Sequence, residues 1–426
     1  TALGLQHVLA MFASNITPAI IVSLAAGVAF GSEAQIYLIQ MAMLFAGVAT
    51  LFQTVGFGPV GARLPIMQGT SFAFVGVLGA TAKIIIDGGG TTKEAMAVVL
   101  TSCIVAGILH LILGSFIKHI RWLFPPLVTG LVILSIGLYL IPVAIKYAAG
   151  GAGPEMGKDS WGSMEHWSVA LSVVIVALGC KFYSRGFISN AAVLIGIIAG
   201  YLLAYSLGLV SFAKVGSASY FSGLEFMKYG WSFNIGVIFV VTLVALVSAI
   251  ETVGDTSATT KAGAGREATD EEISGATYAD GLGSAVAGLF GGLPNTSFSQ
   301  NVGIVGMTGV MSRHVVTIGA IFLIICGLIP KVGAIIASMP FPVLGGGVIV
   351  MFGMVAAAGL NVLSDVKLNR RNMAIIAVSL AFGLGLNLVP DAVRYFPETI
   401  RILAISAVAP TALVAVVLNL ILPEED

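Results

Sequence analysis

Long apolar runs follow one another along the whole chain, separated by short breaks rich in charged residues, glycine or proline. A helix needs about 20 mostly apolar residues to cross a bilayer core about 30 Å thick. Because the runs have this length, the pattern predicts an all-α polytopic membrane protein with fourteen spans. The expected spans cover residues 4–28, 34–56, 66–83, 93–115, 126–146, 167–183, 188–210, 232–258, 276–292, 297–310, 315–336, 341–363, 372–390 and 403–422.

Two of these stretches differ from the others because glycine, hydroxyl and amide residues interrupt them. The third reads LPIMQGTSFAFVGVLG from Leu64 to Gly79. The tenth opens in LPNTSFSQNVGIVGMTG, from Leu293 to Gly309. Matching broken segments in corresponding halves are typical of transporters built from repeats, with the binding site at the repeat interface. Alternatively, they are only short helices between loops.

The number of spans per half predicts how the halves are related. Each broken stretch is third in a half of seven spans. Because seven is odd, the second half must enter the membrane from the opposite side, which predicts two inverted seven-span repeats. The even total of fourteen puts both termini on one side.

The composition agrees with a membrane protein and excludes several other classes. Hydrophobic residues make up 58% of the chain and charged residues 9%, whereas soluble domains carry about 25% charged residues. The net charge is zero and no basic tract is present, so nothing indicates a nucleic-acid partner. The sequence has no HExxH, GxSxG or paired-cysteine motif, so we expect neither an enzyme nor a metal site.

Basic residues indicate the orientation, because cytoplasmic loops are enriched in Lys and Arg. With the termini inside, the inner loops hold eleven of the twenty basic residues and seven of the nine arginines. Of the arginines, only Arg394 and Arg401 fall outside, together with seven lysines. We therefore expect both termini to be cytoplasmic.

Four of the ionisable residues within or beside the apolar runs are candidates for function. Glu251 and Asp255 are four residues apart in the eighth run, on one helix face. Asp280 begins the ninth span, and His7 lies near the start of the first. Intramembrane ionisable residues are costly and point to function. A carboxyl group that gains and loses a proton suits proton coupling, and Glu251, the deepest, is the strongest candidate. Each of the four could instead have a structural role.

The second broken stretch also carries two neutral amides. Gln300 and Asn301 each offer a donor and an acceptor, which complements the polar edge of a cyclic amide. Phe72, in the first broken stretch, could stack on a flat ring. These residue types favour a planar polar heterocycle as ligand, although amides also hold membrane helices together.

The motifs of the chain, in their order and spacing, resemble the nucleobase–ascorbate transporter family (nucleobase:cation symporter 2). The family signature matches Gln300-Asn301-Val302-Gly303 followed by Thr308. The resemblance covers essentially the whole chain. Its other parts are Gln6-His7, QGTSFAF in the third span, FPPLVTG at 124–130, ETVGD at 251–255, ADG at 279–281 and PFPVLGGGVIVMFGM in the twelfth span.

The resemblance implies a division of the chain into two domains. A core domain would hold residues 1–122 (spans 1–4) and 232–338 (spans 8–11). A gate domain would hold residues 123–231 (spans 5–7) and 339–426 (spans 12–14). Spans three and ten would contain short antiparallel strands, and the gate domain would form a homodimer. A Gly196-xxx-Gly200 pair in the seventh span is weak support for the dimer.

The resemblance also implies roles for individual residues. Glu251 would bind one polar edge of a nucleobase and Gln300 the other. Phe72 would stack on the ring, and the main chain of Phe72 and Ser299 would hydrogen-bond to it. The remaining candidates would arrange the site or affect proton coupling, namely His7, Asp255, Asp280 and Asn301.

The expected substrate is an oxidised purine such as xanthine or urate. Asp255 and Gln300 are similar to the xanthine and urate branch, whereas uracil carriers have Glu where Gln300 stands. Val302 and Gly309 depart from residues common in relatives, which leaves the choice among purines open. We therefore expect a symporter that imports the purine across a bacterial inner membrane by an elevator-like movement, with H⁺ as coupling ion and no cofactor.

Three alternatives remain at this point. The first is a symporter for uracil or another nucleobase, and the second is coupling to Na⁺. The third is an anion exchanger or channel with the same inverted-repeat fold. The last is disfavoured because acidic residues, and no Lys or Arg, are expected at the site.

Overall fold

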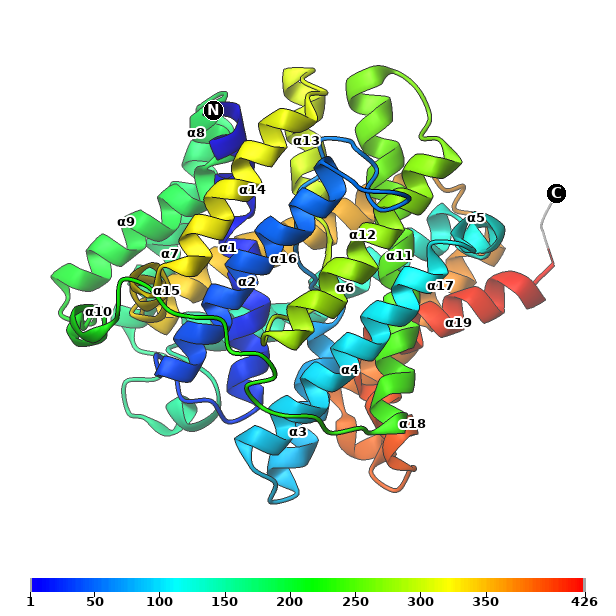
Figure 1. Cartoon of the computed structure of the whole chain (residues 1–426). Coiled ribbons are helices and arrows are strands. Elements are labelled where there is room, and N and C mark those ends of the chain that lie inside the picture. The colour runs from blue at the N-terminus through cyan, green and yellow to red at the C-terminus, as the bar shows by residue number, and fades with distance from the viewer. Residues whose placement is uncertain (1, 424–426) are drawn as a thin grey trace.

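The computed structural model of the chain describes residues 2–423 and is almost entirely helical (Figure 1). The elements of the first half are α1 (Ala2–Ala25), α2 (Glu33–Thr54), β1 (Gln68–Thr70), α3 (Val75–Asp87), α4 (Thr92–Leu113), α5 (Ile117–Ile120), the 3₁₀ turn η1 (Arg121–Leu123), α6 (Pro126–Ala148), the 3₁₀ turn η2 (Gly153–Gly157), α7 (Met164–Tyr183), α8 (Phe187–Asn190), α9 (Ala192–Ser206) and α10 (Ala213–Ser217). Those of the second half are α11 (Ile235–Ala264), α12 (Asp270–Leu289), β2 (Asn295–Ser297), α13 (Ser299–Thr308), α14 (Arg313–Leu328), α15 (Pro330–Ala337), α16 (Phe341–Ser364), α17 (Arg370–Leu388), the 3₁₀ turn η3 (Pro390–Val393), α18 (Glu398–Ile405) and α19 (Val408–Ile421).

Fewer helices than fourteen are long and apolar enough to cross a membrane. Within residues 2–423 there are eight such helices, or up to ten if two bent pairs each form one span. The pair α14 and α15 bends by 80°, and the pair α18 and α19 by 87°. The structure therefore agrees with an all-α polytopic protein, and this criterion supports eight to ten spans.

Within the described residues, four of the fourteen predicted spans contain neither a helix nor a bent helix pair that is both long enough and apolar enough to cross a membrane. The helices of the two broken stretches, α3 and α13, have only 13 and 10 residues, because strands take up part of each stretch. Helix α9 has 15 residues. Helix α12 is long enough, but it begins with Asp270, Glu271 and Glu272 and is too polar to qualify.

The prediction of short antiparallel strands in the third and tenth stretches is confirmed. Gln68 of β1 pairs with Ser297 of β2, and Thr70 pairs with Asn295. Main-chain bonds continue at both ends of the pair, where Ser71 donates to Pro294 at 2.8 Å and Phe298 donates to Met67 at 3.0 Å. Irregular backbone at membrane depth is tolerated only when protein satisfies its polar groups, and here each broken stretch satisfies the other.

Gly69, at the centre of β1, lets the strand pair lie against its neighbours. A Cβ atom at this position would lie 2.5 Å from the ring of Phe298 and 2.6 Å from the side chain of Met11 in α1. No other residue type fits without displacing one of them. The glycine therefore sets how closely α1 and the strands pack.

The helices pack in two groups. The first group contains α1–α4 and α11–α15, and the second contains α6–α9, α16, α17 and α19, whereas α18 contacts helices of both groups. The central pair of the second group is α6 and α16, which approach closely at glycines, as small residues allow in membranes. A Cβ on Gly137 would lie 2.4 Å from the backbone nitrogen of Ala356.

The two groups meet around Phe72, which follows β1. The Phe72 ring packs edge-on against Phe352 of α16, with 5.4 Å between ring centroids. The hydroxyl of Tyr139 in α6 donates to the Phe72 carbonyl at 3.2 Å. The segment that joins β1 to α3 is thus held by the central helices of the second group.

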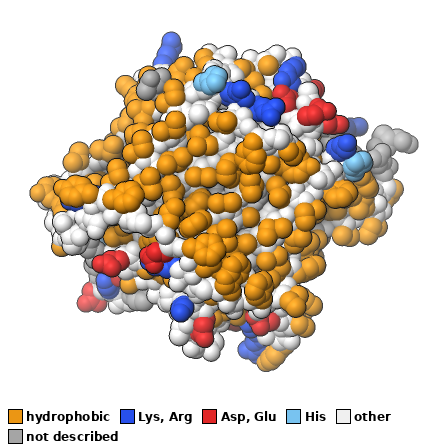
Figure 2. Space-filling model, viewed as in Figure 1, with side chains coloured by type: hydrophobic (Ala, Val, Ile, Leu, Met, Phe, Trp, Pro, Cys, Tyr) orange, Lys and Arg blue, Asp and Glu red, His pale blue; other side chains and the backbone are white. Residues whose placement is uncertain are grey.

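The outer surface fits a bilayer environment. Figure 2 shows a broad belt of apolar side chains, with Lys, Arg, Asp and Glu gathered above and below it. The glycine pair of α9 does not lie on this surface. A Cβ on Gly196 would lie 2.6 Å from the Val173 carbonyl of α7, and one on Gly200 would lie 2.2 Å from the Val173 side chain. The pair packs within the chain and gives no support to a dimer.

Candidate substrate-binding site

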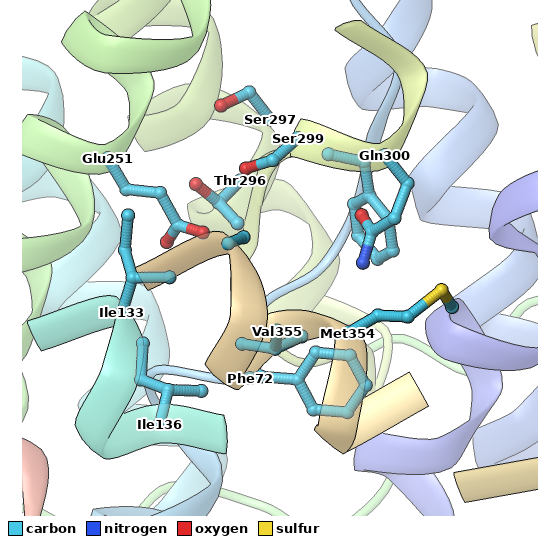
Figure 3. Close-up of a pocket in the computed structure, with 12 residues that line it drawn as sticks. Phe72, Ile133, Ile136, Glu251, Thr296, Ser297, Ser299, Gln300, Met354 and Val355 are labelled. Carbon is cyan, nitrogen blue, oxygen red and sulfur yellow. The ribbon is translucent and has the colours of Figure 1, made fainter. Parts of the chain in front are cut away.

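A cavity of about 210 Å³ lies where the two groups of helices meet (Figure 3). A protein cavity of about 150 Å³ holds benzene, so this one has room for a somewhat larger flat molecule. The cavity combines a polar side with an apolar wall. Its lining residues are Phe72, Ile133, Ile136, Glu251, Thr296, Ser297, Phe298, Ser299, Gln300, Met354, Val355 and Ala358.

The polar side comes from the first group of helices. Figure 3 shows the carboxyl group of Glu251, from α11, and the amide of Gln300, from α13, reaching toward the cavity from two directions. Ser299 begins α13, and no side chain caps this helix. The first backbone N–H groups of a helix lack intrahelical partners, so the start of α13 can donate hydrogen bonds to a ligand.

The structure therefore brings together four residues that the sequence proposes for substrate binding: Phe72, Glu251, Ser299 and Gln300. They come from three separate segments, and their common position around one cavity was not visible in the sequence. That they bind a nucleobase stays a prediction.

The apolar wall comes from the second group and was missed by sequence reasoning. Ile133 and Ile136 project from α6, and Met354 and Val355 from α16 (Figure 3). An apolar residue in an apolar span carries no signal that separates a ligand contact from a lipid contact. Thr296 and Ser297 were also missed, although both lie in the broken stretch beside Ser299.

Asp280 lies behind the cavity and does not line it. It is fully buried in α12. Its Oδ1 accepts a hydrogen bond from Gln68 Nε2 of β1 at 2.5 Å, and its Oδ2 accepts one from the hydroxyl of Thr252. Because Thr252 directly follows Glu251, Asp280 connects the strand pair to the helix that carries Glu251. Gln68 and Thr252 were not predicted as parts of the site.

Asp255 is bound to the other strand. The Ser297 hydroxyl of β2 donates to Asp255 Oδ2 at 2.6 Å. Asp255 lies one helical turn beyond Glu251, which agrees with the expected common face of α11. Gln68 and Ser297 are opposite each other in the strand pair, so the two carboxyl groups hold the same end of it, one on each strand.

His7 and Asn301 meet away from the cavity. The side-chain nitrogen of Asn301 lies 3.0 Å from His7 Nδ1 and donates to the His7 carbonyl at 3.0 Å. Both residues are buried. This contact ties the first turn of α13, and with it Gln300, to α1.

A second cavity of about 400 Å³ adjoins the first and shares Ile133, Glu251, Ser299 and Ala358 with it. It extends along α11 and the second half of α16 as far as Asn361, which is exposed. These helix ends belong to the side predicted to be cytoplasmic. Among the described residues that line the two cavities, none is Lys or Arg.

Comparison with known proteins identifies the family. Residues 1–392 match the sequence model of the Permease family of xanthine and uracil carriers. The chain is 36% identical to the uric acid permease PucJ of Bacillus subtilis, over all of this chain and 92% of PucJ. It is 34% identical to the xanthine permease XanQ of Escherichia coli, over 99% of this chain and 90% of XanQ. A Clostridium perfringens protein provisionally named a purine permease is 39% identical, over 99% of this chain and 90% of that protein.

Solved structures show the same fold at low sequence identity. The transmembrane domain of the cyanobacterial bicarbonate transporter BicA superposes with a TM-score of 0.64 at 15% identity, covering 98% of this chain and 96% of that domain. SLC26A9 superposes with a TM-score of 0.60 at 13% identity, covering 97% of this chain and 64% of that protein. The family match and the relatives together identify the chain as a multi-pass transporter, and not an enzyme, that belongs to the xanthine/uracil permease family.

Proposed function

We propose that the protein is a proton-coupled symporter that imports an oxidised purine base such as xanthine or urate. The carrying observation is one cavity, at the boundary between two groups of helices, that the Glu251 carboxyl group and the Gln300 amide both face. The names of the relatives, which include a xanthine permease and a uric acid permease, support a purine as the substrate.

The lining residues complement such a base. A carboxylate at Glu251 accepts hydrogen bonds from ring N–H groups, and the Gln300 amide can both donate and accept. Phe72 offers an aromatic face, and the apolar wall of α6 and α16 covers the rest of the ring system. Flat heterocycles with polar edges match this combination of surfaces.

Glu251 is the proposed proton-binding group. It lies at the junction of the substrate cavity with the cavity that extends toward the predicted cytoplasmic side. One charge that crosses 100 mV releases about 2.3 kcal/mol. Since 1.4 kcal/mol is a factor of ten, one proton per neutral base concentrates it roughly fifty-fold. For an anionic base, one proton cancels its charge and the membrane potential contributes nothing.

The architecture proposed with this function has fourteen spans in two inverted repeats. Residues 1–122 and 232–338 form the core, and residues 123–231 and 339–426 form the gate. The packing of the helices in two groups supports this division, as does the pairing of β1 with β2 from corresponding positions in the two halves. An elevator-like movement of the core then carries the polar side of the cavity past the apolar wall.

The proposed setting is a bacterial inner membrane with both termini in the cytoplasm. A homodimer through the gate rests on the family resemblance alone. Na⁺ in place of H⁺, and uracil in place of a purine, are the alternatives that the transport experiment below separates.

An anion exchanger is a second candidate, because BicA and SLC26A9 share the fold. Anion sites in such folds need basic residues or helix N-termini. The cavity does contain the start of α13, but it places Glu251 there and, among the described lining residues, no Lys or Arg. A purine with ring N–H groups fits an acidic cavity better than a small inorganic anion does.

Uptake of labelled bases tests the proposal. Cells that lack their own purine permeases and express this chain should accumulate xanthine or urate, and a protonophore should abolish the accumulation. Uptake of uracil alone would reject the purine assignment. Purine uptake that needs Na⁺ and ignores the protonophore would reject the proton coupling, and bicarbonate exchange without base uptake would favour the second candidate.

A further inference from the structure

A third cavity, of about 920 Å³, opens at the opposite end of the molecule from Asp255 and Asn361. Along α6 it is lined by residues from Tyr139 to Lys146, whereas the cavity beside Asp255 is lined by residues from Pro126 to Ile133. The rest of its lining comes from α1, α3, the segment 387–394 and α18. We call this cavity the outer vestibule, because it lies on the side predicted to face away from the cytoplasm.

The outer vestibule carries an excess of positive charge. Its lining includes four basic residues, Lys83, Lys146, Arg394 and Arg401, and two acidic residues, Asp87 and Asp391. Lys83 forms an ion pair with Asp87 at 3.0 Å. The remaining residues give two positive charges more than negative ones in a chain whose formal net charge is zero.

Arg401 has unused hydrogen-bonding capacity in this cavity. Its Nε atom is buried and has no hydrogen-bond partner among the described residues. A buried N–H without an acceptor costs about 1–3 kcal/mol. An oxyanion in the vestibule supplies an acceptor, and guanidinium groups bind planar anions through paired N–H donors.

The same arginines are the exceptions in the charge distribution of the sequence. Seven of the nine arginines fall on the predicted inner side, and the two that do not are Arg394 and Arg401. Both line this one cavity. Membrane topology disfavours arginine in short outer loops, so a ligand in the vestibule gives a reason for their position.

Only a thin layer separates the vestibule from the substrate cavity. Tyr139 lines the vestibule, and its hydroxyl donates to the carbonyl of Phe72, which lines the substrate cavity. Gly76 completes the layer, since a Cβ there would lie 3.3 Å from the Tyr139 ring and 2.5 Å from the Ser406 carbonyl. A ligand bound in the vestibule would therefore lie directly outside the substrate cavity.

We propose that the outer vestibule is an anion-binding antechamber, in which Arg401 and Arg394 hold the anionic form of the purine before it reaches Glu251. The identity of the anion rests on the proposed function, whereas the positive field of the vestibule does not. A cleft whose lining carries an excess of one sign of charge raises the local concentration and the arrival rate of oppositely charged ligands. The effect weakens as salt shortens the Debye length from about 30 Å at 0.01 M to about 10 Å at 0.1 M.

Charged thiol reagents test the positive electrostatic field of the vestibule by a reaction rate that does not depend on transport. Ala80 lines the vestibule and is partly buried, so Ala80→Cys, in a chain whose three native cysteines are replaced by alanine, reports on it. At low salt, with each rate divided by that reagent's rate with a small free thiol, an anionic methanethiosulfonate reagent should modify Cys at this position about tenfold faster than a cationic one, as field effects of this kind predict. Arg401→Gln should reduce the ratio. Lys93→Gln, which removes one charge from the exposed first turn of α4 at the same end of the molecule, should leave the ratio of the two rates unchanged.

Uptake kinetics then test whether the positive field of the vestibule affects the apparent affinity for the substrate. Arg401→Gln should raise the KM for urate several-fold at low salt and leave the maximal rate unchanged, and the difference should shrink at high salt. Equal rates of the two reagents relative to a free thiol, a ratio that Arg401→Gln leaves unchanged, or an unchanged KM would refute the proposed anion-binding role of the vestibule. If the unaltered chain takes up no base at all, the proposed function fails, and the reagent ratio still decides whether the vestibule attracts anions.

Discussion

Thr252 provides a sharp test of how the strand pair positions Glu251. Its hydroxyl donates to Asp280, lies 3.3 Å from the Thr296 hydroxyl and accepts from Ser297 at 3.4 Å. Thr252→Val keeps the shape of the side chain and removes all three contacts. Leaving buried polar groups unsatisfied costs about 1–3 kcal/mol, and Asp280 is fully buried.

Thr256 is the matched control, because it lies one turn further along the same buried face of α11. Its hydroxyl only donates back to the Thr252 carbonyl within the helix, at 2.7 Å. Thr256→Val therefore removes a contact that such helix positions lose at little cost. Thermal unfolding of the two purified variants in one detergent, together with purine binding by calorimetry, makes the comparison.

The expected result is a lower unfolding temperature and weaker purine binding for Thr252→Val than for Thr256→Val. Binding should weaken because β2 and the turn of α11 that carries Glu251 lose a common attachment. Equal unfolding temperatures and equal affinities in the two variants would refute the reasoning. The hydrogen bonds around Asp280 would then have no part in holding the site.

Three further predictions concern single contacts. Glu251→Gln keeps the size of the side chain but replaces hydrogen bonds to a charged group, which are worth about 1.5–3 kcal/mol. Purine affinity measured by calorimetry should therefore fall about ten- to a hundred-fold, and unchanged affinity would mean that the site lies elsewhere. Gly69→Ala places a Cβ 2.5 Å from the Phe298 ring and should destabilise the protein by about 1–3 kcal/mol, and a normal unfolding temperature would contradict the close packing of α1 on the strands. Tyr139→Phe removes the bond to the Phe72 carbonyl and should speed modification of Thr296→Cys by a thiol reagent added from the outside; an unchanged rate would show that the Tyr139 hydroxyl does not help to close that side.

The sequence was informative wherever a residue type was unusual for a membrane interior. Glu251 and Gln300 stand out in an apolar chain, and the structure places both at the cavity. Ile133 and Met354 do not stand out, because the same residue types face lipid everywhere else. Their contribution depends on the meeting of α6 and α16, which is a property of the tertiary packing.

Long-range contacts set a second limit on prediction. Asp280 was expected to arrange the site, but its partner Gln68 lies 212 positions earlier in the chain, and no local pattern connects the two. The number of spans was limited in the same way. Hydropathy treats each broken stretch as one helix, whereas the pairing of β1 with β2 shortens the helical part of both.

The strand pair also has a consequence for biosynthesis. Asn295 leaves the ribosome 225 residues after its partner Thr70. At about 5–20 residues per second, the first broken stretch waits roughly 10–45 s in the membrane for the main-chain groups that complete it. During this interval the half-site at Phe72 exists without the half-site at Gln300. The binding site therefore cannot form before β2 has been made, and any chain truncated before β2 leaves β1 without its partner strand.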